Sequence, residues 1–317
     1  MDNDNKKKLI VLTGPTAVGK TDLSIKLAKA IGGEIISADS IQVYKHFDIG
    51  SAKITPDEMQ GIRHHLIDVL EPTECFDVAT FKKMAEEAME DIYNRGNIPI
   101  VTGGTGFYIQ ALLYDIDFKE TEDDGYRKKL EALYNEKGAN YMWNMLKDID
   151  PEAAASIHEN NVKRVIRAIE YQHQNNRRIS EHNQEERAKE SPYNFAYIVL
   201  NCNRELLYER INKRVDIMME GGLVDEVKEL LHKYNLTSDM TSMQGIGYKE
   251  IVPYIKGESS LEDAEYILKR DTRHFAKRQL TWFKREKDVV WLDKDEHKTE
   301  KEQLDFILNL LKEKNIY

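Results

Sequence analysis

The sequence predicts an α/β fold in which a mostly parallel sheet is flanked by helices and carries a helical insertion domain. Three observations support this prediction. Short apolar runs, such as residues 9–12 and 195–200, have the length and composition of strands that are buried on both faces. Helical patterns follow several of these runs, as they do in parallel sheets. From about residue 119 to residue 191 the strand patterns vanish, and the chain becomes charged and helical.

The length also bears on the domain organisation, because 317 residues are many for a single domain. We expect a catalytic core formed by residues 1–118 and 195–317, with a helical insertion domain at residues 119–194. The formal net charge is −10. By itself this charge argues against a nucleic-acid partner, but an average charge hides local patches.

Composition excludes several classes of protein. No apolar run approaches 18 residues, so we expect no association with a membrane, and the polar start of the chain has no apolar segment typical of a secretory signal. Cys75 and Cys202 have no C-x-x-C partner. We therefore expect neither a disulfide framework nor a cysteine zinc site, and a reducing cytoplasm is the simplest setting.

The first expected strand is followed by a phosphate-loop pattern, G-x-x-x-x-G-K-[ST], that matches at every defined position. Its residues are Gly14, Pro15, Thr16, Ala17, Val18, Gly19, Lys20 and Thr21. The glycines let backbone N–H groups turn toward an anion, Lys20 supplies a mobile positive charge, and the Thr21 hydroxyl is placed to ligate Mg²⁺. The strand before the loop and the helix after it disfavour a chance turn. The pattern predicts a P-loop NTPase-like core that binds a di- or triphosphate, without saying which.

The second expected strand, residues 34–39, ends in Asp39. Groups at the carboxyl ends of parallel strands line the ligand crevice, so Asp39 is expected near the phosphate loop. There its carboxylate could accept a proton from a nucleophile that attacks the bound phosphate ester. The alternative is a helix N-cap or a turn residue. We favour the functional interpretation because the strand-end position and the phosphate loop agree.

Residues 48–53 and 64–68 show little periodicity and are expected to form loops. The second of these segments contains the adjacent residues His64 and His65. Because nothing nearby completes a recognised metal-ligand spacing, a structural or RNA-facing role is favoured over a metal site.

A helix is expected at residues 78–95 and a strand at residues 98–101, which runs into another glycine-containing turn. Two interpretations of this turn stay open. Thr105 and nearby backbone amides could reach the ligand crevice, or Gly103 and Gly104 could merely permit tight packing.

Within the expected insertion, residues 160–170 form an amphipathic helical pattern. Val162, Val165, Ile166 and Ile169 make an apolar stripe that excludes the cations Lys163, Arg164 and Arg167. A basic helical face is usually only solvated, but such a face could also hold a large anionic acceptor.

After the expected strand at residues 195–200, Arg210 and Arg214 stand four residues apart on a helix and share a face. They could bind phosphate oxygens, or they could pair with neighbouring glutamates. Further on, residues 270–287 contain seven basic and two acidic residues, with Trp282 and Phe283 among them. Concentrated positive charge with aromatic residues is typical of contact with a phosphate backbone. The last strand and the closing helix are expected to be structural.

Together, these motifs resemble those of the tRNA dimethylallyltransferase (tRNA isopentenyl transferase) family. The resemblance spans almost the whole chain and is carried by G-P-T-A-x-G-K-T at 14–21, D-S-x-Q-x-Y at 39–44, D-I-G-[ST]-A-K at 48–53, G-G-T-x-x-Y at 103–108, the stretch 161–170, G-x-G-Y-[KR] at 245–249 and K-R-Q-x-T-W at 277–282. The phosphate loop alone is shared with many kinases, whereas the joint set is highly specific. The sequence ends without the C-terminal zinc finger of the eukaryotic branch, so it looks like the bacterial form.

The resemblance implies transfer of a dimethylallyl group from dimethylallyl diphosphate to N6 of the adenine just 3′ of the tRNA anticodon. The loop would hold the diphosphate rather than ATP, with Mg²⁺ on Thr21. Lys20 and arginines such as Arg210 and Arg214 would stabilise the departing diphosphate. Asp39 would orient and deprotonate the adenine amine. The partners implied are dimethylallyl diphosphate and the tRNA anticodon stem-loop, with no protein partner and no membrane.

The family's RNA-contacting stretches match four segments and two single positions of this chain. The matching residues are Asp39, Ser40, Ile41, Gln42, Thr105, Arg127, Lys163, Arg164, Val165, Ile166, Arg167, Gln244, Gly245, Ile246, Gly247, Tyr248, Lys249, Lys277, Arg278 and Gln279. At Gln244 the chain departs from some relatives, which carry arginine there.

Two other classes of function stay open. A kinase of nucleosides or small molecules would use the same loop with ATP, but it needs neither a basic helical insertion nor the basic segment at 270–287. An RNA-binding regulator that uses a nucleotide as a switch would explain the basic segments. It would not explain Asp39 and Thr105 converging on the phosphate site.

Overall fold

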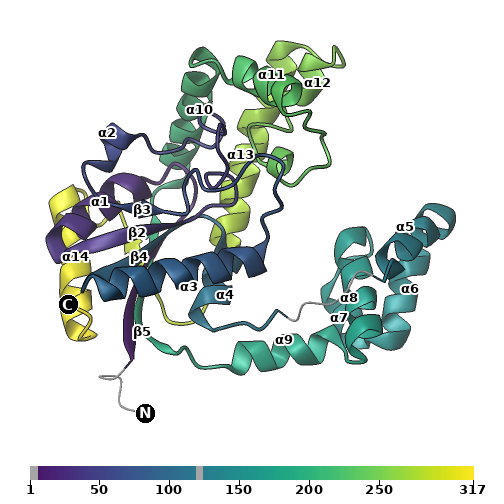
Figure 1. The fold of residues 1–317 in the computed structure, drawn as a ribbon, viewed down its shortest axis with the longest axis horizontal. Helices are drawn as coiled ribbons and strands as arrows, with labels where there is room; N and C mark the ends of the chain where they lie inside the picture. The colour runs from purple at the N-terminus through teal and green to yellow at the C-terminus, as the bar shows by residue number, and fades with distance from the viewer. Residues whose placement is uncertain (1–5, 119–123) are drawn as a thin grey trace. The chain divides into compact units, whose positions relative to one another are not determined.

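Figure 1 shows the fold in a computed structural model, which describes residues 6–118 and 124–317. The chain divides into two compact units. The core unit comprises Met1–Leu113 and Pro192–Tyr317, and the helical unit comprises Tyr114–Ser191. The domain boundary expected at residue 119 lies outside the described residues.

The core unit is built on a six-stranded sheet with the strand order β3-β2-β4-β1-β5-β6. Every neighbouring pair is parallel, which confirms the expected α/β fold with a parallel sheet. The first strand, β1, lies near the centre, and its residues from Leu9 to Leu12 are at most 1% exposed. The strands are β1 (Lys7–Thr13), β2 (Gly33–Ala38), β3 (His64–His65), β4 (Ile98–Gly103), β5 (Tyr193–Asn201) and β6 (Val289–Asp293).

Helices cover both faces of this sheet (Figure 1). Right-handed crossovers place α1 and α3 on opposite faces, because the chain moves in opposite directions along the sheet in the two connections. Helices α1 and α14 lie side by side, as do α10 and α13. The elements of the core unit are α1 (Lys20–Ile31), α2 (Pro56–Met59), α3 (Val78–Asn94), α4 (Gly106–Leu113), α10 (Arg204–Glu220), α11 (Leu223–Lys233), the 3₁₀ turn η2 (Ser242–Gln244), α12 (Val252–Ile255), α13 (Leu261–Phe283) and α14 (Glu300–Glu313).

The expectation of a loop at residues 64–68 is wrong for its first two residues, which form the edge strand β3. His64 and His65 pair with Ile35 and Ile36 of β2. So short a strand has no periodicity that a sequence pattern could reveal, and its neighbour alone defines it.

The two histidines have structural contacts. The Nε2 atom of His65 lies 2.8 Å from Oε2 of Glu34, and Arg95 donates two hydrogen bonds of 2.8 Å to the same carboxylate. Burial by itself would raise the pKa of Glu34, but hydrogen bonds from Arg95, His65 and Asn97 outweigh it and lower the pKa to about 2. This network agrees with a structural role for the pair.

The described residues of the helical unit form five helices with an apolar core of their own. Its helices are α5 (Tyr126–Lys137), α6 (Ala139–Ile149), α7 (Pro151–Ser156), α8 (Val162–Asn175) and α9 (Ile179–Ala188). Helix α8 buries Val165 and Ile169 against Met142 and Leu146 of α6. This is the apolar stripe expected from the sequence. In the part of the chain that the structure describes, no helix of either unit is long and apolar enough to cross a membrane.

Candidate active site

The phosphate loop lies between β1 and α1, at the carboxyl edge of the sheet. Gly14 has φ +150°, and a Cβ atom on it would come within 2.6 Å of the Leu200 carbonyl oxygen of β5. Only glycine permits this close approach of two backbones. Ala17 and Gly19 also have positive φ, at 63° and 91°. The chain therefore turns sharply into the first turn of α1, where free N–H groups attract an anion.

Lys20 folds back over this loop. Its Nζ atom donates hydrogen bonds to the carbonyl oxygens of Gly14 and Pro15, at 3.0 and 2.9 Å. Burial of the ammonium and the nearby positive charge of Arg214 lower the pKa of Lys20 to about 7, while the charge of Asp39 acts in the opposite direction. The loop follows β1 and Asp39 follows β2, and both strands end beside Gly103 of β4, so Lys20 and Asp39 lie at the same edge of the sheet, where the charge of Arg214 also acts on Lys20.

The two arginines of α10 take different neighbours. Arg214 acts on Lys20, whereas Arg210 acts on the pKa values of Lys294 and Cys202. Arg210 lines a hollow with Lys294 and Cys202, and the binding of one diphosphate by both arginines stays a prediction. Neither arginine forms an ion pair within the described residues, which leaves the alternative of pairing with glutamates unsupported.

Thr21 is exposed at the first turn of α1, and its hydroxyl makes no hydrogen bond to another described residue. The described residues contain no group of three His, Cys, Asp or Glu side chains that could hold a metal. A Mg²⁺ ion here would therefore need phosphate oxygens and water besides the Thr21 hydroxyl. This donor set is the usual one for Mg²⁺ at a phosphate loop, so the residues present fit the ion.

Asp39 directly follows β2. Its Oδ1 atom accepts hydrogen bonds from the N–H groups of Ile41 and Gln42, at 2.9 and 3.2 Å. The carboxylate thus closes a turn, as the alternative interpretation expected. Among the described residues, Oδ2 has no hydrogen-bond donor. One oxygen fixes the position of the side chain, and the other is available to accept a proton.

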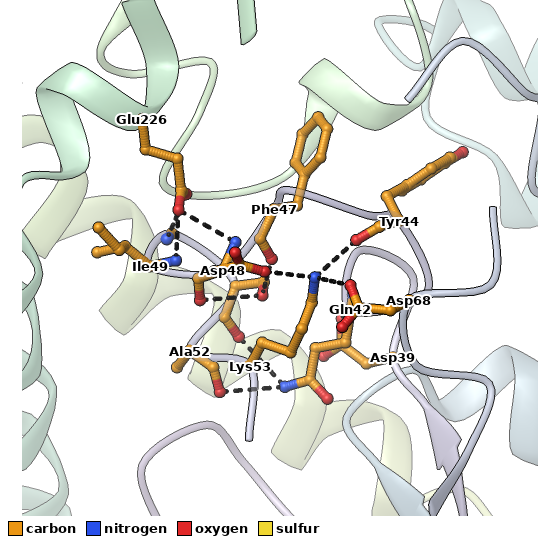
Figure 2. A network of polar contacts seen from close by, with 12 residues as sticks. Asp39, Gln42, Tyr44, Phe47, Asp48, Ile49, Ala52, Lys53, Asp68 and Glu226 are labelled. Atoms are coloured by element: carbon orange, nitrogen blue, oxygen red, sulfur yellow. Dashed lines mark hydrogen bonds and ion pairs between the residues drawn. The ribbon is translucent and has the colours of Figure 1, made fainter. Parts of the chain in front are cut away.

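The loop after Asp39 is held by Glu226, which the sequence did not single out, together with Tyr248, which was expected to contact RNA (Figure 2). Glu226 of α11 accepts hydrogen bonds from the N–H groups of Asp48, Ile49 and Gly50, at 3.1, 2.7 and 3.0 Å. The phenolic oxygen of Tyr248 donates to the same carboxylate at 2.9 Å. No local pattern marks Glu226, because its partners lie far away in the sequence.

Lys53 and Gln42 secure the same loop from its other side (Figure 2). The Lys53 ammonium donates to the Tyr44 carbonyl at 2.7 Å and forms ion pairs with Asp48 and Asp68. The Gln42 amide donates to two carbonyl oxygens of the loop. Gln42 is half-buried, so most of its hydrogen bonding serves the loop.

Gln279 of α13 reaches the phosphate loop itself. Its Oε1 atom accepts a hydrogen bond from Thr16 N–H and its Nε2 atom donates to the Gly104 carbonyl oxygen, both at 2.9 Å. The residue is only 5% exposed. We expected Gln279 to contact RNA, and this is corrected: both ends of its amide are used inside the protein.

The turn at residues 103–105 shows the tight packing that one interpretation expected. A Cβ atom on Gly103 would lie 2.3 Å from the Ala38 carbonyl oxygen, and one on Gly104 would lie 2.1 Å from the Gln279 amide nitrogen. Thr105 is half-buried, and its N–H donates to the Ala38 carbonyl at 3.3 Å. It therefore lies beside Asp39, at the end of β2.

The residues expected to contact RNA in the core unit fall into two groups. Tyr248 is fully buried, and Gly245 and Gly247 pack against Ile41 and Gly50. A direct RNA contact by the Tyr248 side chain is not supported, because it lies beneath the loop that follows Asp39. The other residues keep exposed or half-exposed side chains: Ser40, Ile41, Gln244, Ile246, Lys249, Lys277 and Arg278.

The residues expected to contact RNA in the helical unit also fall into a buried group and an exposed group. Val165 is fully buried and Ile166 is 4% exposed, so their side chains belong to the core and not to an RNA surface. Lys163, Arg164 and Arg167 are exposed. Two of the expected cations meet at one carboxylate, because Arg167 and Arg127 lie 3.0 and 3.6 Å from Oε2 of the buried Glu170. Burial thus separates the positions that support the helical unit from those on its surface.

Comparisons with known proteins were made for the whole chain. A family model described as IPP transferase matches residues 42–286. A curated tRNA dimethylallyltransferase of Lachnoclostridium phytofermentans is 57% identical over 309 residues, which cover 97% of this chain and 98% of the relative.

Solved structures of tRNA isopentenylpyrophosphate transferases are also similar to this chain over nearly its whole length. A tRNA isopentenylpyrophosphate transferase of Bacillus halodurans is 44% identical with a TM-score of 0.73, and 98% of each chain is covered. A tRNA isopentenylpyrophosphate transferase of Staphylococcus epidermidis is 47% identical with a TM-score of 0.72, covering 97% of this chain and 99% of the other. A eukaryotic dimethylallyltransferase acting on tRNA is 33% identical with a TM-score of 0.76, covering 90% and 74%.

Proposed function

The chain belongs to the IPP transferase family, and from this premise we propose that it transfers a dimethylallyl group from dimethylallyl diphosphate to tRNA. The acceptor that we propose is N6 of the adenine just 3′ of the anticodon. The observation that carries the proposal is the convergence of Lys20, Arg214 and Asp39 beside the phosphate loop. This crevice holds cations for a diphosphate and a carboxylate for a nucleophile within one site.

At the allylic carbon the transfer forms one bond and breaks one bond, and a proton moves from N6 to a base. The adenine N6 attacks the allylic carbon of the donor, while the bond from that carbon to the diphosphate oxygen breaks and its electron pair leaves with the diphosphate. The proton lost from N6 passes to Oδ2 of Asp39, the oxygen that the turn leaves available. An aromatic amine is a weak nucleophile, so removal of its proton and departure of the diphosphate must occur close together.

The residues on the donor side stabilise the charge that develops on the diphosphate. Backbone N–H groups of the loop surround it, Lys20 lies over the same loop, and Arg214 adds a positive charge near Lys20. When bound, Mg²⁺ held at Thr21 would supply a further positive charge to the diphosphate oxygens. A diphosphate also favours the charged form of Lys20, whose pKa of about 7 in the free protein leaves it partly neutral.

We propose that the exposed cations of each unit contact phosphates of the anticodon stem-loop. In the core unit these are Lys249, Lys277 and Arg278, and in the helical unit Lys163, Arg164 and Arg167. Taking the adenine out of its stack costs a few kcal/mol. Contacts to the backbone offset this cost. A tRNA substrate favours the cytoplasm as the place of action.

One experiment tests the proposal directly. The protein is incubated with unmodified tRNA and either dimethylallyl diphosphate labelled in its five-carbon group or ATP labelled in its γ-phosphate. Label from the first donor should enter the tRNA at a single adenine, and label from ATP should enter neither RNA nor nucleoside. Incorporation from ATP alone would establish the kinase alternative, which the family does not favour. Incorporation from neither donor would contradict both enzymatic functions.

A further inference from the structure

A second group of cations surrounds a hollow next to the phosphate loop. The hollow has a volume of about 320 Å³ and lies where β5 and β6 end. We call it the cationic hollow and define it by Arg210 of α10, Lys294 and Lys298 after β6, and Cys202 after β5. Asp295 is the acidic residue on its wall. The proposed function uses none of these side chains.

The three cations make no ion pair with a described residue, although Asp295 stands on the wall and the charges of Asp22 and Glu300 act on Lys294. Within the described residues, neither Arg210 nor Lys298 forms an ion pair, and the half-buried Lys294 ammonium contacts no carboxylate. Burial and the positive charge of Arg210 lower the pKa of Lys294. Like charges that gather in one place without a counter-charge destabilise one another. A bound anion would remove this cost, which is why such a cluster indicates a binding site.

Lys294 connects the hollow to the phosphate loop. Its Nζ atom donates a hydrogen bond to the Val18 carbonyl oxygen at 3.2 Å and lies 3.0 Å from where a Cβ atom on Gly19 would be. The hollow is nevertheless a separate group of charges. Lys20 is influenced by Arg214 and Asp39, whereas Lys294 is influenced by Arg210, Cys202, Asp22 and Glu300. Two cationic groups thus stand against one loop, each with its own arginine from α10.

We propose that the cationic hollow is a second anion site, which binds inorganic diphosphate after it leaves the phosphate loop. This step rests on the proposed function, because transfer to tRNA releases a diphosphate next to Lys294. The arginine fork and two ammonium groups match the oxygens of a phosphate group. A small hollow lined mainly by charged side chains suits a charged product better than an organic ligand, which would need mainly apolar walls.

Calorimetric titration of the full-length protein with inorganic diphosphate and Mg²⁺ tests the proposal. The wild type should bind two equivalents, and the double variant Arg210→Ser/Lys294→Ser should bind one. Lys20→Ala should lose the tighter site and keep the weaker one. Lys301→Ser is the matched control, because Lys301 is an exposed lysine of α14 paired with Asp305, outside the hollow. It should keep both sites.

Several outcomes would overturn the proposal. These are a single equivalent in the wild type, two equivalents in the double variant, or loss of the second equivalent in Lys301→Ser. Orthophosphate provides a second arm. Binding of orthophosphate to the hollow as tightly as diphosphate would overturn the assignment to the product.

The proposed function is checked separately on the same variants. In multiple turnover the double variant should release diphosphate more slowly than the wild type or be less inhibited by added diphosphate, and its single-turnover rate of dimethylallyl transfer is measured separately to test the proposed function. Because binding of diphosphate to the hollow is measured without tRNA, a failure of transfer and a failure of the second site can be told apart. Circular dichroism of each variant would verify that the fold is intact.

Discussion

Helices α8 and α13 both carry basic side chains on an exposed face, but the buried face of α8 only packs, whereas that of α13 also contacts the donor site. Helix α8 buries Val165 and Ile166 in the small apolar core of the helical unit. Helix α13 buries Gln279, whose amide binds the phosphate loop and the turn at Gly104. A basic surface on α8 can therefore change without consequence for the donor site. A change on α13 can reach the donor site through a single side chain.

Close packing adds to this difference. A Cβ atom on Gly106 would lie 2.3 Å from the Trp282 ring, so α13 and α4 meet where only glycine fits. Interiors packed this tightly transmit small displacements. A motif such as K-R-Q-x-T-W therefore combines two roles. Lys277 and Arg278 are exposed, and Gln279 faces the phosphate loop.

The largest effect is expected at Asp39, because its proposed role in the reaction belongs to the core unit alone. Asp39→Asn should lower the single-turnover rate by roughly 10²–10⁴-fold, because the amide cannot accept the proton from N6. The affinity for tRNA should stay within a few fold. Rapid-quench measurement with labelled donor checks the rate. Arg167→Ala, the matched change on α8, should leave that rate unchanged at saturating tRNA. A near-normal rate in Asp39→Asn would remove the general-base role.

The second largest effect is expected at the buried Gln279 of α13, where a change should alter donor affinity, whereas a change on α8 should not. Gln279→Leu keeps the bulk of the side chain but leaves Thr16 N–H and the Gly104 carbonyl without their partner. A buried polar group without a partner costs about 1–3 kcal/mol, so donor affinity should fall roughly 5- to 100-fold. Fluorescence or calorimetric titration with dimethylallyl diphosphate measures this affinity.

Arg278→Ala is the control on the same helix, and it should weaken tRNA binding without changing donor affinity. An increase in donor affinity in Gln279→Leu would mean that Gln279 competes with the diphosphate for Thr16 N–H. That result would contradict the positioning role.

A third effect concerns pH and again belongs only to the core unit. Because the free protein lowers the pKa of Lys20 to about 7, its ammonium is largely neutral above that pH and must take up a proton when an anion binds. Donor affinity should be fully present below pH 7 and should fall up to tenfold for each pH unit above it. Titrations between pH 7.5 and pH 9, where the donor is ionised, test this. Lys20→Arg stays charged, so its affinity should be flat there; an equal slope in both proteins would contradict the assignment.

The smallest effect is expected on α8. Arg167→Ala removes one exposed cation, and binding of tRNA should weaken a few fold. The slope of log affinity against log salt should fall by about one unit or less, because one fewer counterion is released. Filter binding over a salt series measures the slope. Lys312→Ala, an exposed lysine of α14, is the control and should change neither value. Equal slopes for wild type and Arg167→Ala would mean that α8 is only a solvated face.

Several features followed from local sequence alone. The phosphate loop, the strand end at Asp39 and the apolar stripe of α8 were predictable, because each depends on neighbours within a few residues. The parallel sheet also followed, since buried strands alternating with helices allow few other arrangements. The edge strand β3 did not, because its two residues gain strand geometry only from β2.

Only the tertiary structure decided which residues of each motif face outward and which support the site. Gln279 and Tyr248 stand in motifs expected to contact RNA, yet folding buries both and directs their polar atoms to the phosphate loop and to Glu226. Lys294 follows a strand expected to be purely structural, and folding brings it to Val18. Sequence distance hides these contacts, because a hydrogen bond depends on where the packed sheet and helices place two atoms, and that placement is a property of the whole core.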